Sequence, residues 1–462
     1  MSLSELPHEL LVLIFQTLDS SSLRHVRLLN KACASAAAIP LFHTIHLRPL
    51  HRSWRRIDCV STASHLQKHV RSVHLNTDVL NPNHGQQLRS HGFRTLILQK
   101  SYTSISGLAV RTISEEQIDA LYLAYMDILR EQVAFESIRP TDIRSVLTSF
   151  PHLQEICCQR NGCDYEPLLS SFILSPAWPV ARSPFRHFYR VCMSLQLESL
   201  TLDPLSWGDI LYPFTQTEQE LRMTRTQKLK LGLNNESFDR DQLMQPQHLK
   251  RLVTYLSLFS KLQHLSIHLG TLTRQPRSPR SPPQNKISNA VTGMIFPTLK
   301  HVSFCSFNTE ISPLLAFLRN HSATLHHLHL EDVTILPNIL SASGEDSVME
   351  LFGEIRDACN LQTVTLSGTF TNLRDEAWEV RDDKKSPECL CVKLEMYMAR
   401  KGKWPIGDSP AHYQRQRLDR AEWLEEIEYT MQSSESHTEY LTFEVDDSWQ
   451  DLSWQWATHL LL

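Results

Sequence analysis

Three histidines close together, in the segment His326–His329 (HHLH), have the types and spacing that most directly suggest chemistry. Imidazole nitrogens are common zinc ligands, but a structural zinc site needs four converging donors, and this segment supplies no complete set. Leu328 and Leu330 alternate with the histidines, which indicates a strand with one buried face. We therefore interpret His327 and His329 as polar residues on the open face of a strand, and the sequence predicts no metal site.

Signatures of the common catalytic classes are missing from the sequence. The 13 glycines form neither a GxGxxG motif nor a P-loop, and no GxSxG motif occurs. His8 and Glu9 are not followed by a second histidine at zinc-protease spacing. The ten cysteines are irregularly spaced without a CxxC, which is typical of reduced thiols rather than of a disulfide scaffold. We predict a cytoplasmic or nuclear protein that is not an enzyme and binds no cofactor.

Composition and charge indicate two kinds of partner that we do not expect the protein to bind, namely nucleic acids and membranes. The 462 residues are 41% hydrophobic and 21% charged, which excludes wholesale disorder. There are 46 Lys and Arg residues against 50 Asp and Glu, so we predict no nucleic-acid partner. The sequence contains no run of 18 apolar residues, and the short apolar run Leu10–Phe15 has no basic region before it. We therefore expect neither a membrane span nor a signal peptide.

The first 45 residues have the pattern of three short helices. Pro7 suits a first helical turn, and one apolar stripe follows it, made of Leu10, Leu11, Ile14, Phe15 and Leu18. Residues 19–22 interrupt the stripe and offer a helix cap. A second short helix follows, with Leu23, Val26 and Leu29 on one side, and a third, 31–38, ends at Pro40. A unit of this size is marginally stable alone, so its apolar faces need another domain or a partner.

This segment resembles the F-box family. The residues Leu6-Pro7-x-Glu9-Leu10-Leu11-x-x-Ile14-Phe15-x-x-Leu18-Asp19 and then Leu23-x-x-Val26-Arg27-Leu28-Leu29-Asn30-Lys31 align with the family pattern without a gap. Cys33 stands where many members carry Trp. The resemblance implies docking onto the Skp-type adaptor of a cullin–RING ubiquitin ligase, while the rest of the chain selects a protein substrate of unknown identity. The alternative is a scaffold that binds the adaptor without leading to degradation. The implied adaptor-binding residues are Leu6, Pro7, Leu10, Leu11, Ile14, Phe15, Leu18, Leu23 and Val26.

Beyond residue 65 a pattern apolar-x-x-apolar-x-apolar recurs, with helical stretches between its copies. The clear copies are Val70-Val73-Leu75, Phe93-Leu96-Leu98, Leu153-Ile156-Cys158, Leu197-Leu200-Leu202, Leu262-Leu265-Ile267, Leu299-Val302-Phe304, Leu325-Leu328-Leu330 and Leu361-Val364-Leu366. Weaker copies are Thr226-Leu229-Leu231, Cys389-Val392-Leu394 and Thr438-Leu441-Phe443. This periodicity predicts an α/β fold in which the three-helix F-box is followed by a curved solenoid with a parallel sheet. The pattern looks like the divergent leucine-rich repeats of fungal F-box proteins.

The domain organisation follows from these patterns. We expect an F-box at 1–48, a leucine-rich-repeat-like solenoid at 49–447 and a C-terminal capping tail at 448–462. Two insertions are expected in the solenoid: a disordered one at 271–290, rich in Pro, Arg and Ser, and a helical one at 400–435. Helices are also expected at 313–320 and 345–359. In the first insertion, Ser278-Pro279 and Ser281-Pro282 have the form of proline-directed phosphorylation sites.

Aligning the repeats places equivalent outward residues in columns across the sheet. The first column holds Lys228, His264, His301, His327 and Thr363. The second holds Lys230, Ser266, Ser303, His329 and Thr365, and a third His268, Cys305, Glu331 and Ser367. An open sheet face is polar in any case, which accounts for Ser and Thr but less well for His in three consecutive repeats. We therefore predict that this face reads the substrate, through His264, His268, His301, His327, His329 and Glu331.

Overall fold

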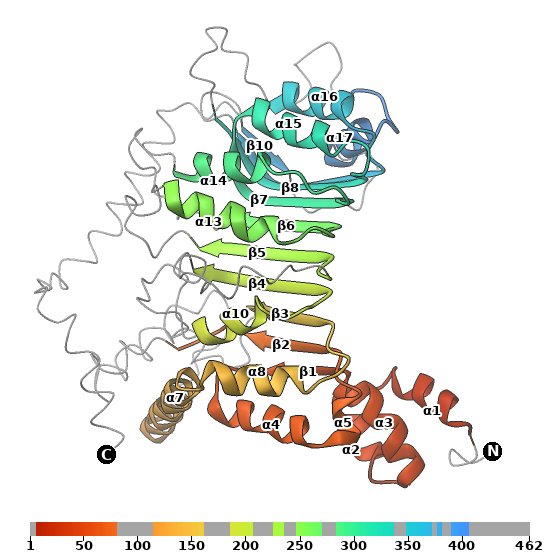
Figure 1. Ribbon diagram of the computed structural model, residues 1–462, viewed down its shortest axis with the longest axis vertical. Coiled ribbons are helices and arrows are strands. Elements are labelled where there is room, and N and C mark those ends of the chain that lie inside the picture. Colours follow the sequence, from red (N-terminus) through yellow and green to blue (C-terminus); the bar gives the residue numbers. More distant parts are fainter. Residues whose placement is uncertain are drawn as a thin grey trace, which may run out of the picture.

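Figure 1 shows the protein, as a computed structural model, with a small helical unit at one end and a stack of strands extending away from it. The structure describes residues 6–80, 114–160, 185–206, 225–234, 246–269, 283–336, 348–371, 377–380 and 390–405. Within this part of the chain no helix is long and apolar enough to cross a membrane.

The helical unit consists of α1 (His8–Phe15), α2 (Ser20–Val26) and α3 (Lys31–His43). Each predicted helix is present, although the third continues through Pro40 instead of ending there. The chain passes from α3 directly into β1 (Thr44–Leu47), the first strand of the sheet. The sheet therefore begins before residue 49, where we expected the second domain to start.

In the described part of the chain the sheet has ten strands, in the same order as in the sequence. Strands β1 to β9 pair in parallel, and β10 pairs antiparallel with β9. After β1, the strands are β2 (Ser72–Asn76), β3 (Glu155–Gln159), β4 (Ser199–Ser206), β5 (Lys228–Asn234), β6 (His264–Leu269), β7 (His301–Thr309), β8 (His327–Ile335), β9 (Thr363–Thr371) and β10 (Ala377–Val380). The α/β class and the parallel sheet are as predicted.

A repeated backbone contact fixes the start of successive strands against the preceding one. The N–H groups of Lys300 and His301 both donate to the carbonyl of Gln263, at 2.8 and 2.9 Å. One strand later, the N–H groups of His326 and His327 donate to the carbonyl of Lys300 in the same way. Because these strands start on the same kind of contact, the first residues of successive strands keep one register and lie side by side, and the register shifts only further along, after Leu202 in β4 and after Glu331 in β8.

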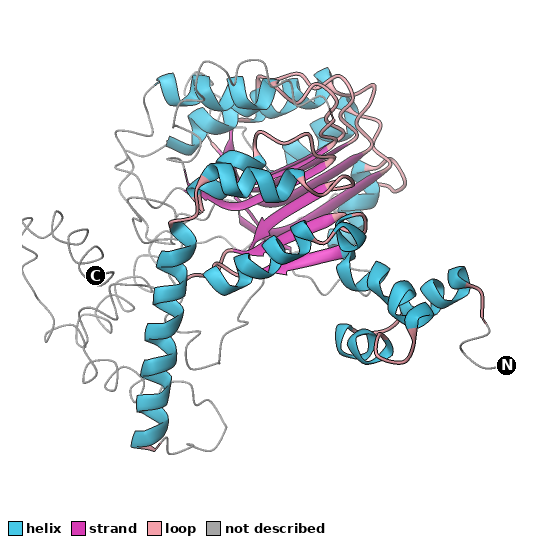
Figure 2. Cartoon of the chain, turned by 60° about the horizontal axis from the view of Figure 1, so that its bottom comes forward, coloured by secondary structure: helices cyan, strands magenta, loops and turns pink. Residues whose placement is uncertain are grey.

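Among the described residues, helices cover one face of the sheet and no helix covers the other, which is called the open face below (Figure 2). They connect successive strands and pack on their neighbours, as the contacts of α13 with α14, α14 with α15 and α15 with α16 show. Leucines at alternate strand positions, such as Leu265, Leu328 and Leu330, are buried beneath them. The helices are α4 (His51–Thr62), α5 (Ser64–Gln67), α7 (Glu115–Glu136), α8 (Pro140–Thr148), α10 (Arg186–Cys192), α13 (Pro246–Ser257), α14 (Pro283–Thr292), α15 (Ile311–Asn320), α16 (Val348–Ala358) and α17 (Leu390–Met398).

The backbones of β7, β8 and β9 share an irregularity at the same level of the sheet. Ser306, Asp332 and Gly368 follow the register partners Cys305, Glu331 and Ser367, and each has a positive φ, of 53°, 49° and 71°. The Asp332 carboxylate accepts a hydrogen bond from the Thr369 N–H at 2.8 Å. A Cβ on Gly368 would overlap that carboxylate, so glycine is required there both by backbone conformation and by space.

Two expectations are wrong in part. Residues 283–290 of the expected disordered insertion belong to α14, because Ile287 and Val291 are spaced four apart and both bury against the core. The weak repeat Cys389-Val392-Leu394 is not a strand, because its residues from 390 onward form α17. In that helix Cys391, Leu394 and Met398 share one buried face.

Other expectations fall partly or wholly outside the described residues. These include Phe93-Leu96-Leu98, Thr438-Leu441-Phe443, the phosphorylation sites, the tail and most of the 400–435 insertion. Residues 400–405 of that insertion are described and are not helical.

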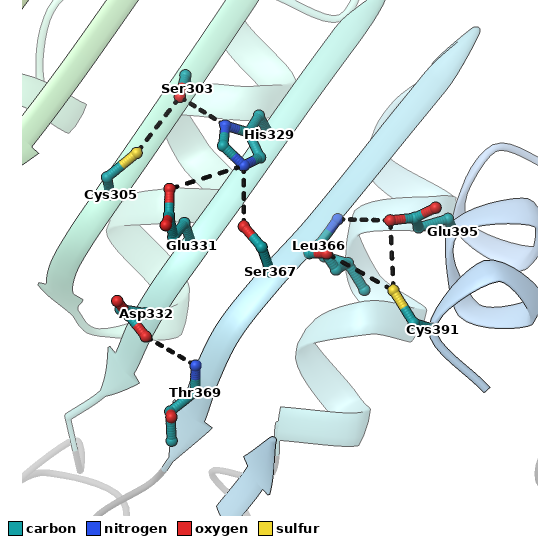
Figure 3. A network of polar contacts seen from close by, with 10 residues as sticks. All are labelled: Ser303, Cys305, His329, Glu331, Asp332, Leu366, Ser367, Thr369, Cys391 and Glu395. Atoms are coloured by element: carbon teal, nitrogen blue, oxygen red, sulfur yellow. Dashed lines mark hydrogen bonds and ion pairs between the residues drawn. The ribbon is translucent and has the colours of Figure 1, made fainter. Parts of the chain in front are cut away.

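The final strands are covered by elements that the repeat pattern did not predict. β10 pairs with the second half of β9, and α17 packs beside β9. The Leu366 N–H donates to a Glu395 carboxylate oxygen at 2.7 Å, and the Cys391 thiol points to the same oxygen and to the Leu366 carbonyl (Figure 3). A side chain of α17 thus satisfies a backbone group of β9 in place of a further parallel strand.

Candidate functional site: an apolar helical surface and a polar groove

The helical unit has its own small core, separate from that of the sheet. Leu11 and Phe15 are each 1% exposed and pack with buried Leu23, Cys33, Ala36 and Ala37. Small residues of α3 allow the other two helices to approach closely. A second set of large apolar side chains is left on the surface, and these we name the exposed apolar set: Leu10, Leu13, Ile14, Leu28 and Leu29.

Polar side chains cap two of the three helices, α2 and α3. Asp19 directly precedes α2, and its carboxylate accepts a hydrogen bond from the Ser22 N–H at 2.6 Å. That bond lowers the pKa of Asp19. The Asn30 side chain caps α3 in the same way, accepting from the Cys33 N–H at 2.8 Å. Both caps occupy positions of the F-box-like motif, so the motif encodes helix ends as well as apolar contacts.

The structure divides the predicted adaptor-binding residues into three groups. Pro7, Leu10 and Ile14 are exposed. The partly buried residues are Leu6, Leu18 and Val26, and the fully buried ones are Leu11, Phe15 and Leu23. The last three shape the surface from beneath and do not form it. Leu13, Leu28 and Leu29 were not among the predicted residues although they are 59%, 83% and 65% exposed.

The three predicted columns lie on the open face in the predicted register. His264 pairs with His301, His301 with His327 and His327 with Thr363. His268 is the register partner of Cys305, which in turn pairs with Glu331. Outward residues of β4 to β9 line an open groove of about 330 Å³ on this face. The six predicted substrate-binding residues thus share one face, and His264, His301, His327 and His329 line its groove.

The first column is a stack of imidazole rings. The ring centroids of His264 and His301 are 4.0 Å apart, and those of His301 and His327 are 3.9 Å apart. Partial burial, followed by repulsion from neighbouring cationic groups, lowers the pKa of all three and brings that of His301 to about 4. The His327 ring also contacts the Thr363 hydroxyl. The stack is therefore neutral near pH 7 and presents ring nitrogens to the groove as hydrogen-bonding groups.

Two lysines of β5, Lys228 and Lys230, line the groove. Lys228 is exposed, and Lys230 lies 3.5 Å from the Asp203 carboxylate of the neighbouring strand. The carboxylate of Asp203 occupies the space that a Cβ on Gly232 would fill. Lys228 gives the β5 side of the groove a positive charge that Asp203 does not neutralise.

A second cluster of polar side chains, from β7, β8 and β9, surrounds His329 (Figure 3). His329 Nδ1 lies 2.9 Å from the Ser303 hydroxyl, and His329 Nε2 lies 3.1 Å from the Ser367 hydroxyl and 4.0 Å from a Glu331 oxygen. The Ser303 hydroxyl also contacts the Cys305 sulfur at 3.6 Å. Burial raises the pKa of Cys305 to about 12, so this thiol is protonated at neutral pH.

A family model for the F-box domain matches residues 3–45, which cover α1 to α3. No curated protein matches the chain. An F-box domain indicates binding to a Skp-type adaptor in a cullin–RING ligase, and proteins with this domain are generally substrate receptors and not enzymes. No family match confirms the resemblance of the later residues to leucine-rich repeats.

Proposed function

We propose that this protein is the substrate-recognition subunit of an SCF-type cullin–RING ubiquitin ligase, acting in the cytoplasm or nucleus. The F-box docks onto the Skp-type adaptor, and the open face of the repeat sheet binds a protein substrate. The observation that carries this proposal is the exposed apolar set on a domain that matches the F-box model.

The exposed apolar set supports direct docking. Leu10, Leu13 and Ile14 follow each other at helical spacing, so one side of α1 presents three large side chains to solvent. Burying such a side chain in a partner contributes about 1.5–3 kcal/mol. Leu28 and Leu29 add two more between α2 and α3. Exposed apolar residues at this density mark an interaction surface.

The groove supports recognition of an acidic substrate segment. Lys228 supplies positive charge, and the neutral stack supplies hydrogen-bonding nitrogens. A substrate carboxylate beside His264 or His301 raises the pKa of that imidazole relative to the free protein. Binding then takes up protons, so substrate affinity increases as the pH falls from 7 toward 6.

The alternative function is a scaffold that binds the adaptor without degrading its partner. Both functions use the same two surfaces, so they differ only in what happens to the captured protein. Degradation requires that the partner's half-life lengthen when the F-box is removed, whereas a scaffold leaves that half-life unchanged.

The test combines capture of partner proteins with measurement of their half-lives. Full-length protein and a variant lacking residues 6–43 are expressed with a proximity-labelling tag, and labelled proteins are compared. A substrate accumulates with the F-box-deleted variant, because it is bound but not ubiquitylated, and its half-life lengthens. The same labelled proteins with unchanged half-lives favour the scaffold, and absence of the adaptor from the full-length sample contradicts both functions.

A further inference from the structure

Three side chains with different donor atoms converge on the open face beside the groove, and one of them, His329, also lines the groove. The Cys305 sulfur, a His329 ring nitrogen and a Glu331 carboxylate oxygen all lie within 4.8 Å of one another. Cys305 and Glu331 are register partners on β7 and β8, and His329 lies two residues before Glu331 on the same face. A polar open face explains serines and threonines, but it does not require a thiol beside an imidazole and a carboxylate.

The orientation of the His329 ring suits ligation through one particular nitrogen. Ser303 contacts Nδ1 at 2.9 Å, while Nε2 is the atom that faces Glu331, at 4.0 Å (Figure 3). A hydrogen bond from Nδ1 to the Ser303 hydroxyl places the lone pair on Nε2. This is the arrangement by which neighbours fix the tautomer of metal-binding histidines.

The three donors are both accessible and held by rigid elements. The side chains of His329 and Glu331 are 34% and 42% exposed, and Cys305 is partly buried. Paired strands fix their Cα positions, and the backbone turns at Ser306 and Asp332 follow Cys305 and Glu331 directly. In a tetrahedral zinc site the donors lie roughly 3.5 Å apart, so modest side-chain rotations close the set.

We propose that Cys305, His329 and Glu331 bind a zinc ion, with the fourth coordination position open to the groove and occupied by water. A thiolate with an imidazole disfavours magnesium and calcium, which prefer oxygen ligands, and favours zinc. As the sulfur–zinc bond forms, the Cys305 proton passes to solvent. The thiolate and carboxylate then balance the charge of the ion, and His329 exchanges its contact with Ser367 for the zinc bond.

The test uses cobalt(II), which binds zinc sites and gives thiolate-to-metal absorption in the near ultraviolet. Purified full-length protein is stripped by a chelator, titrated with cobalt and then back-titrated with zinc. We expect one saturable site whose absorption zinc abolishes. Cys305→Ser loses the absorption, and His329→Gln or Glu331→Gln weakens cobalt binding about tenfold or more.

Cys157→Ser is the matched control, since Cys157 occupies an outward position of β3 in the column that contains His329 but is not part of the cluster. It leaves the absorption unchanged. Retention of the absorption in Cys305→Ser, or the absence of saturable binding in the unmodified protein, overturns the proposal. Circular dichroism of each variant establishes that the sheet is intact. Because the readout is metal binding alone, its outcome is independent of ubiquitin-ligase function.

Discussion

The imidazole rings of His301 and His327 lie face to face, with centroids 3.9 Å apart and planes that differ by 2°. Parallel register sets this spacing, because the two residues are direct partners on β7 and β8. Two positive charges about 4 Å apart repel by about 1 kcal/mol in water and about 4 kcal/mol near a protein surface. Partial burial first, and then repulsion between cationic groups, lower the pKa of these histidines, so the stack is uncharged at neutral pH and gives the groove a face of neutral rings.

The first prediction concerns the role of this stack. Replacing both rings, by His301→Ala with His327→Ala, removes ring surface and hydrogen-bonding nitrogens from the groove without touching α1 to α3. We expect loss of substrate capture with unchanged adaptor binding, measured in parallel pull-downs from one lysate. Full capture of the substrate by the double variant would place the substrate surface elsewhere in the chain.

A second prediction follows from the lowered pKa of His301. Burial disfavours its protonated form, as do His264, His327, His326 and Lys300, so its folded pKa of about 4 lies below the unfolded value of about 6.5. The unfolded state therefore binds more protons in this window, and stability falls as the pH drops from 6.5 toward 4. We expect His301→Gln to lose less thermal stability than the unmodified protein between these pH values. Equal losses would show that the pKa of His301 is not depressed in the folded state.

The third prediction compares two glycines. Gly368→Ala places a side chain at a positive φ and against the Asp332 carboxylate, so we expect destabilisation by about 1–3 kcal/mol. Gly353 lies within α16, and apart from its chain neighbours and the surrounding helix backbone no atom lies within 4 Å of the position that a methyl group would take, so Gly353→Ala should stabilise by about 0.5–1 kcal/mol. Chemical denaturation of both variants measures the difference. A neutral Gly368→Ala would show that the common turn of β7, β8 and β9 carries no constraint.

A fourth prediction separates the two cores. Phe15 is 1% exposed in the core of the helical unit, so Phe15→Ala should cost about 3–5 kcal/mol and open that unit locally. Hydrogen exchange should increase across α1 to α3 while β7 and β8 stay protected. Leu13→Ala, at a residue that is 59% exposed, is the matched variant and should leave exchange unchanged. Increased exchange in β7 would mean that the two cores unfold together.

The sequence alone predicted which residues of neighbouring strands pair on the open face of the sheet. Alternation assigns each strand residue to a face, and the repeated leucines align successive strands, so the pairing of His264, His301 and His327 followed from spacing alone. Spacing failed at the weak repeat Cys389-Val392-Leu394, because apolar residues three apart, such as Cys389 and Val392, also fit one face of a helix, and residues 390–398 form α17. β1 was missed because it follows α3 with no intervening loop.

The functional surfaces were predicted less completely. An apolar stripe does not distinguish Phe15, which fills the core, from Ile14 beside it, which is 40% exposed, since both are large and apolar. The Cys305 cluster combines two columns and two strands, so no linear motif contains it. The sequence motif His326–His329 contains three histidines, but only His329 belongs to that cluster.

We propose that the exposed apolar set docks the F-box onto a Skp-type adaptor. The most direct measurement is the affinity of purified adaptor for full-length protein and for Leu10→Ala with Ile14→Ala, by isothermal titration calorimetry. Leu123→Ala on α7, at a residue that is 69% exposed, is the control. We predict that the double variant binds at least about tenfold more weakly, since each side chain contributes about 1.5–3 kcal/mol when buried, while Leu123→Ala binds normally. Unchanged adaptor affinity of the double variant, with α1 to α3 still folded, would show that these two side chains do not form the adaptor-docking surface.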